Sequence, residues 1–100
     1  MNNPKVLIVE DDVSIGMVVS AALAAENIDT QICDTVGARD AALANGHFDL
    51  MLTDVVLRDS DGLETLKEAM ATAPDMPVII MSAQNTLETA VRASEIEAFE

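Results

Sequence analysis

The sequence is poor in cysteine, in long apolar runs, in basic residues and in glycine-rich motifs. Its single cysteine, Cys33, excludes an internal disulfide. The longest apolar runs have about four to five residues, far fewer than the ~20 of a membrane-spanning helix, so no membrane contact is expected. No signal peptide precedes the first run, and we therefore expect a cytoplasmic protein. Neither G-x-G-x-x-G nor a glycine-rich Lys-Ser/Thr loop occurs, which leaves nucleotide binding without support.

Basic residues are scarce relative to acidic ones. The chain of 100 residues has 5 Lys and Arg against 18 Asp and Glu, a formal net charge of −13. Such a surface repels nucleic-acid phosphates, so this segment is not expected to bind nucleic acid directly. The simplest interpretation is a solvated acidic surface, and the alternatives are a cation site or a basic partner. Hydrophobic residues make up 50% of the chain, which is enough for the core of one small domain.

Short apolar runs alternate with helical patterns along the chain. The apolar runs occupy residues 6–9, 30–33, 48–52 and 78–81. Helical patterns come after them at about residues 15–23, 36–45, 63–70 and from Asn85 onward, with Thr35 as an expected N-cap. This fourfold β-α alternation favours an α/β fold, a doubly wound parallel sheet with helices on both faces. The weak second run is expected at the side of the sheet.

Three details of packing can be predicted from the same patterns. In the first helix, the spacing i, i+3, i+4, i+7, i+8 predicts an inward stripe of Ile15, Val18, Val19, Ala22 and Leu23. The methionines at positions 17, 51, 70 and 81 fall in the apolar pattern and are expected to fill the core. Gly46 suits a left-handed residue at the end of the second helix, and Asn27 is the expected stop of the first.

Acidic residues and one hydroxyl stand at the ends of the apolar runs. The first run ends in Glu10, Asp11 and Asp12, the third in Asp54 and the fourth in Ser82. In open parallel sheets, ligands bind beyond the carboxyl ends of the strands. We therefore expect these side chains to converge on one edge of the sheet.

Such a cluster has two interpretations. Two carboxylates ~5 Å apart repel by roughly 3 kcal/mol at an effective dielectric near 20. A bound cation, or a proton on one of the carboxyl groups, would offset this repulsion. Oxygen ligands without His or Cys favour Mg²⁺ or Mn²⁺, and an aspartate carboxylate can attack phosphorus. Alternatively, the acids cap the helices that come after the strands. Asp12 taken alone fits either role equally well.

Four segments together resemble the receiver domain of bacterial two-component response regulators. They are residues 6–12 (VLIVEDD), 49–54 (DLMLTD), 61–63 (DGL) and 77–83 (PVIIMSA), which span almost the whole chain. Residues 81–86 and 98–100 are most similar to the NtrC-like class, which activates transcription with the sigma-54 polymerase. The resemblance implies a flavodoxin-like sheet and a switch domain rather than an enzyme, apart from slow self-dephosphorylation.

The resemblance also implies a role for each site residue. Asp54 matches the phosphoacceptor, which takes a phosphoryl group from a histidine kinase. Asp11 and Asp12 match the acidic pair that holds Mg²⁺ (or Mn²⁺), together with the Asp54 carboxylate and the Val56 carbonyl. Ser82 matches the switch hydroxyl, which turns toward the phosphoryl oxygens and changes partner contacts.

The chain departs from the family pattern at its end. The resemblance implies a fifth strand with a lysine and a fifth helix, and the sequence stops at Glu100. We therefore expect residues 1–100 to be a C-terminally incomplete receiver domain of four strands, from a longer regulator with ATPase and DNA-binding domains. An uncovered fourth strand at residues 78–81 is expected to favour a homodimer or a swapped oligomer. The alternative function is a docking or dimerisation module that keeps the fold without phosphorylation.

Overall fold

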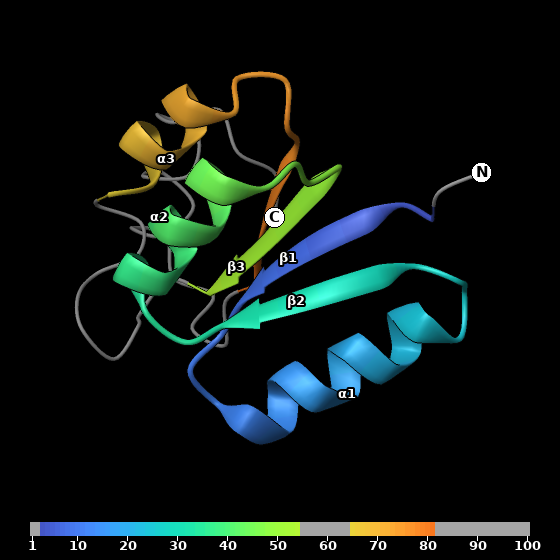
Figure 1. Cartoon of the computed structure of the whole chain (residues 1–100). Coiled ribbons are helices and arrows are strands. Elements are labelled where there is room, and N and C mark those ends of the chain that lie inside the picture. The colour runs from blue at the N-terminus through green and yellow to red at the C-terminus, as the bar shows by residue number, and fades with distance from the viewer. Residues whose placement is uncertain (1–2, 55–64, 82–100) are drawn as a thin grey trace.

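A computed structural model of the chain shows a four-stranded parallel sheet in the order β2-β1-β3-β4 (Figure 1). It describes residues 3–54 and 65–81. The elements are β1 (Lys5–Val9), α1 (Val13–Ala24), β2 (Asp29–Cys33), α2 (Val36–Asn45), β3 (Leu50–Asp54), α3 (Leu66–Thr72) and β4 (Val78–Met81). The predicted doubly wound parallel sheet is confirmed, with β2 at one side. The helix expected from Asn85 onward lies outside the described residues.

The parallel register places the carboxyl ends of the strands at one edge. Val9 at the end of β1 pairs with Cys33 of β2 and with Thr53 of β3. Asp54, the next residue of β3, pairs with Met81 of β4. Because all these pairs are parallel, the residues just beyond β1 and the last residue of β3 must meet at the same edge.

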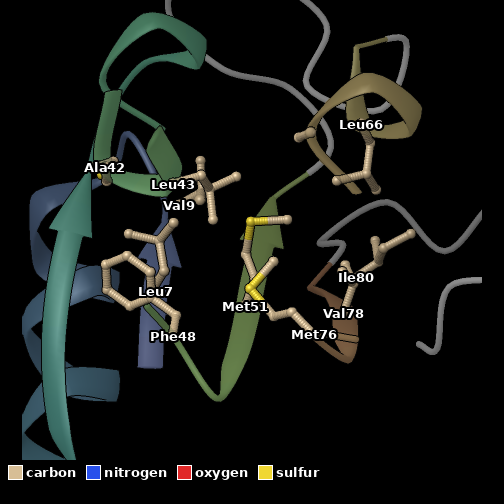
Figure 2. Close-up of a cluster of buried hydrophobic side chains, with 12 residues drawn as sticks. Leu7, Val9, Ala42, Leu43, Phe48, Met51, Leu66, Met76, Val78 and Ile80 are labelled. Carbon is tan, nitrogen blue, oxygen red and sulfur yellow. The ribbon is translucent and has the colours of Figure 1, made fainter. Parts of the chain in front are cut away.

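The main core lies between the sheet and the pair α2 and α3, which Figure 1 shows on the same face. Alternate strand residues point into it, because successive side chains of a strand face opposite sides. Figure 2 shows this cluster, which contains Leu7, Val9 and Met51 of the strands, Leu43 of α2, Leu66 of α3 and Ile80 of β4. Cys33 is also buried in this core, as expected of a small apolar side chain.

Helix α1 covers the opposite face of the sheet and packs mainly on β2 (Figure 1). Gly16 is its one fully buried residue, and a Cβ there would lie 3.5 Å from Cγ2 of Ile32. The expected inward stripe is therefore wrong at Ile15 and Val18, whose exposed fractions are 45% and 69%, and at Ala22, which is also exposed. Met17 is exposed too, so its assignment to the core is also wrong.

The composition of α1 explains this error. Its sequence, VSIGMVVSAALA, contains no charged residue on any side, so the apolar periodicity does not mark one face clearly. The helix faces the sheet with Gly16, whose lack of a side chain leaves room for the Ile32 side chain of β2. With 12 residues it is the longest helix of the described part, in which no helix is long and apolar enough to cross a membrane.

The helix ends agree with the sequence except at Gly46. Thr35 caps α2, because its Oγ1 accepts a hydrogen bond of 3.0 Å from the Ala38 amide. Asn27, the expected stop of α1, has a positive φ of 61°. Gly46 is extended, with φ −151°, so its predicted left-handed conformation is wrong. The chain there runs directly into the extended approach to β3, which needs no left-handed residue.

Two valine-to-alanine substitutions test which side chains are buried in the core and which are exposed on α1. Val9 is 0% exposed in the core, whereas Val18 is 69% exposed on α1. We expect Val9→Ala to lower the free energy of unfolding by about 2 kcal/mol, because it removes two buried methyl groups. Val18→Ala is expected to change it by less than ~0.5 kcal/mol. Urea unfolding followed by circular dichroism measures both, and equal losses would contradict the assigned packing.

Candidate functional site

Three carboxylates meet at the carboxyl edge of the sheet. Glu10 and Asp11 come directly after β1, and Asp54 is the last residue of β3. One carboxylate oxygen from each lies within 4.8 Å of the other two. Glu10 is buried, with an exposed fraction of 5%, and the other two are partly buried. The register of β1 and β3 therefore forces three acidic groups together.

Backbone hydrogen bonds hold Glu10 in this position. Its amide donates to the Cys33 carbonyl at 2.9 Å, which extends the pairing of β1 with β2 by one residue. Its Oε1 accepts a hydrogen bond of 3.3 Å from the Asp12 amide. The side chain is thus fixed between the end of the sheet and the start of α1.

The environment of Glu10 favours its protonated form. Burial raises the pKa of Glu10 to about 7, and a hydrogen bond with Asp54 and the charge of Asp54 add to the rise. The charge of Asp11 acts in the same direction, while the hydrogen bond from the Asp12 amide lowers the pKa. In the absence of a cation, the cluster therefore gains a proton as the pH falls through about 7.

The structure brings together two of the five expected site residues. Asp11 and Asp54 lie in the cluster, as the sequence predicted for both. The Oδ1 of Asp12 instead accepts a hydrogen bond of 3.2 Å from the Ile15 amide and caps α1. Val56 and Ser82 lie outside the described residues.

Sequence reasoning placed Glu10 at the strand end without giving it a role in the site. The signal that could have found it is the unbroken buried run of β1, which continues into Glu10. Asp12 stands three residues before Ile15, the spacing of an N-cap and the amide that it binds.

The donor set suits a hard divalent cation. The cluster in the described residues consists of carboxylate oxygens alone, which Mg²⁺ and Mn²⁺ prefer over the nitrogen and sulfur ligands of zinc or copper. A divalent charge would also relieve the repulsion that raises the pKa of Glu10. The residues therefore fit such an ion, and Asp54 offers a carboxylate nucleophile beside it.

Curated relatives are transcription regulators. The chain is 36% identical to the DNA-binding transcriptional regulator NtrC of Rhizobium meliloti and 38% identical to that of Azospirillum brasilense. Both alignments cover 100% of this chain and 21% of the relative. The transcriptional regulatory protein ZraR of Escherichia coli K12 is 33% identical, over 99% of this chain and 22% of the length of ZraR. The chain thus spans about a fifth of the length of these relatives.

Solved structures agree with the fold. A CheY-like receiver domain protein from Methanospirillum hungatei JF-1 matches with a TM-score of 0.90 and 31% identity, over 96% of this chain and 77% of that chain. A response regulator receiver domain from Francisella matches with a TM-score of 0.86 and 25% identity, over 96% of this chain and 79% of that chain.

One family match covers the described sheet from Val6 onward. The family profile described as the response regulator receiver domain matches residues 6–100, which includes the acidic cluster. With its α/β sheet and its similarity to NtrC-type regulators, the chain belongs to the response regulator receiver domain family.

Proposed function

We propose that this chain is the phosphoacceptor switch of a two-component response regulator, in which Asp54 receives a phosphoryl group from a histidine kinase. The observation that carries the proposal is the position of the Asp54 carboxylate, beside Glu10 and Asp11 at the edge where parallel sheets bind ligands. The family membership of the chain supports the same function.

The proposed transfer needs little covalent chemistry from the protein. A deprotonated Asp54 oxygen attacks the phosphorus of a phosphohistidine, a P–O bond forms and the P–N bond breaks. The electron pair of the broken bond stays on the imidazole nitrogen, and Asp54 becomes an acyl phosphate. The chain's contribution is to hold Asp54 in line at the end of β3, as phosphoryl transfer depends on positioning and charge stabilisation.

We assign the cation ligands to Asp11 and Asp54, with the Val56 carbonyl as a further ligand implied by the family. Bound Mg²⁺, or Mn²⁺, would neutralise charge on the phosphoryl oxygens. Glu10 lies beside them as the second acid of the site, and the capping of α1 by Asp12 argues against direct ligation by Asp12. Ser82 remains the predicted switch hydroxyl.

The kinase is proposed to cover the exposed apolar side chains of α1. Val13 and Val18 are 68% and 69% exposed, and Met17 is 62% exposed, on a helix without charged residues. Exposed apolar patches of this kind mark interaction surfaces. The helix begins two residues after Asp11, so a partner docked on it would reach the cluster. A second copy of the chain is the competing occupant.

The output of the switch is proposed by analogy with the longer relatives. Those relatives are transcription regulators, and the chain matches about a fifth of their length. We propose that residues 1–100 serve as the receiver domain of a cytoplasmic regulator that also carries ATPase and DNA-binding domains. Phosphorylation would add a dianion at Asp54 and shift the contacts of the surrounding surface.

Labelling with acetyl phosphate and Mg²⁺ tests the phosphoacceptor. We expect intact-mass spectrometry to show one added phosphoryl group on the parent and none on Asp54→Asn. The control is Asp49→Asn. Asp49 directly precedes β3, at the end of the strand opposite Asp54, and this variant is expected to label like the parent. An unlabelled parent or a labelled Asp54→Asn variant would contradict the proposal.

Thermal melts with Mg²⁺ test the cation ligands. Mg²⁺ at 100 times its Kd is expected to stabilise the parent by about 2.7 kcal/mol, because it binds the folded state alone. Asp11→Asn is expected to abolish this gain. Asp12→Asn is expected to retain it, since Asn caps a helix as well as Asp. Loss of the gain in Asp12→Asn would instead place Asp12 among the ligands.

The pH dependence of stability without metal tests the environment of Glu10. Its folded-state pKa of about 7 lies above its usual value, so folding binds this proton more tightly. That contribution is present below about pH 4.3 and is lost as the pH rises through about 7. In EDTA, the unfolding free energy of the parent should therefore fall relative to that of Glu10→Gln between these values. Parallel urea-unfolding profiles for the two proteins would contradict the assignment.

A further inference from the structure

A surface groove runs along the seam between α2 and α3. Its larger part is a hollow of about 320 Å³ at the C-terminal ends of the two helices, and its smaller part is a hollow of about 220 Å³ between them. Leu43 and Thr72 line both hollows, which are therefore adjacent. The groove lies on the face of the sheet opposite to α1 (Figure 1), and no carboxylate of the acidic cluster lines it.

Helical spacing explains which side chains line the smaller hollow. Asp40 and Leu43 are three residues apart on α2, and Glu68 and Thr72 are four residues apart on α3. Residues at these spacings lie on the same side of a helix. Because α2 and α3 pack against each other, the two sides meet at a common seam.

The floor of the larger hollow is apolar. Leu43, Phe48 and Met76 line it, and all three belong to the buried core cluster of Figure 2. Gly46 also lines this hollow, and a Cβ at Gly46 would lie 3.7 Å from Cε2 of Phe48, an ordinary contact distance. Because Gly46 has no side chain, the space beside the Phe48 ring stays open to an apolar side chain of a partner.

The rim of the groove has unpaired negative charge. Glu68 lines the smaller hollow and Asp75 lines the larger one, and both residues are exposed. Neither carboxylate takes part in an ion pair within the described residues. Of the described Lys, Arg and His side chains, only His47 lines the groove, and it lies 3.5 Å from a further acidic residue, Asp49. The rim therefore favours a cationic ligand.

The charge of the whole chain limits what can occupy the groove. With a net charge of −13, a second copy of the chain would be repelled, whereas a basic partner would be attracted. Asp40 also lines the groove, although it is already paired with Arg39 at 2.9 Å. An apolar floor with carboxylates along its rim is complementary to a helix that carries apolar side chains on one side and lysine or arginine beside them.

We propose that the groove between α2 and α3 is a docking surface for a basic amphipathic helix of a partner protein. An apolar side chain of that helix enters the larger hollow beside Phe48, and its basic side chains pair with Glu68 and Asp75. This inference goes beyond the proposed function of Asp54 and does not depend on it, since the groove and the acidic cluster share no residue.

The probe is a fluorescein-labelled peptide of about 18 residues, made of leucine and lysine at helical spacing. Fluorescence anisotropy measures its dissociation constant from the chain. Two control peptides are a scrambled sequence of the same composition, which has no apolar side, and a version with glutamate in place of lysine. We expect both controls to bind at least about tenfold more weakly, and added salt to weaken binding of the probe.

Charge variants test the rim. We expect Glu68→Gln and Asp75→Asn each to raise the dissociation constant of the probe about twofold to fivefold, because each removes one exposed ion pair. The matched control is Glu26→Gln, which removes the same charge from an exposed position after α1, away from the groove. This control is expected to bind the probe like the parent. Equal losses for Glu26→Gln and Glu68→Gln would show a general attraction to an acidic protein and overturn the inference.

A variant that fills the larger hollow tests the floor without any change of charge. We expect Gly46→Leu to raise the dissociation constant roughly fivefold or more, because its side chain occupies the space beside Phe48. The matched control Gly37→Leu adds the same side chain at an exposed position of α2 outside the groove and is expected to bind like the parent. Circular dichroism confirms that each variant is folded.

Two further results would overturn the inference. If Val18→Ser weakens the probe while Gly46→Leu and Glu68→Gln do not, the peptide docks on α1. If sedimentation shows that the chain associates with itself and that Gly46→Leu abolishes this association, the occupant of the groove is a second copy.

Discussion

The structure depends on holding three carboxylates together against their mutual repulsion. Glu10, Asp11 and Asp54 meet because β1 and β3 are parallel neighbours whose carboxyl ends share one edge. The pKa of Glu10, raised to about 7 by burial and by Asp54, is the electrostatic consequence. A proton or a cation must compensate such a cluster. This requirement makes the cluster responsive to divalent ions and to a new phosphoryl charge.

The rest of the fold is arranged around this edge. The core between the sheet and helices α2 and α3 supports the strands from one face, and a hydrogen bond from the buried Arg39 of α2 to the Thr65 hydroxyl joins the two helices. On the other face, α1 begins directly after the cluster and presents uncharged apolar side chains to the outside. A partner that delivers a phosphoryl group and a cation that stabilises it would therefore act at adjacent surfaces.

The sequence predicted the elements well and their tertiary partners less well. An unbroken apolar run such as residues 6–9 is enough to predict a buried strand. The cap of α2 is also predictable, because Thr35 binds an amide only three residues away. The buried side of α1 was mispredicted, because a helix without charges does not mark its outer face. The raised pKa of Glu10 and the hydrogen bond of the buried Arg39 to Thr65 involve partners 44 and 26 residues away, which no local pattern contains.

The most direct test of the central claim is chemical mapping of the acyl phosphate. Borohydride reduces an aspartyl phosphate to homoserine, which peptide mass spectrometry locates in the sequence. After treatment of the chain with acetyl phosphate and Mg²⁺, the account predicts homoserine at position 54 and at no other aspartate. Homoserine at Asp11 or Asp12, or at no position, would contradict the assignment of Asp54 as the phosphoacceptor.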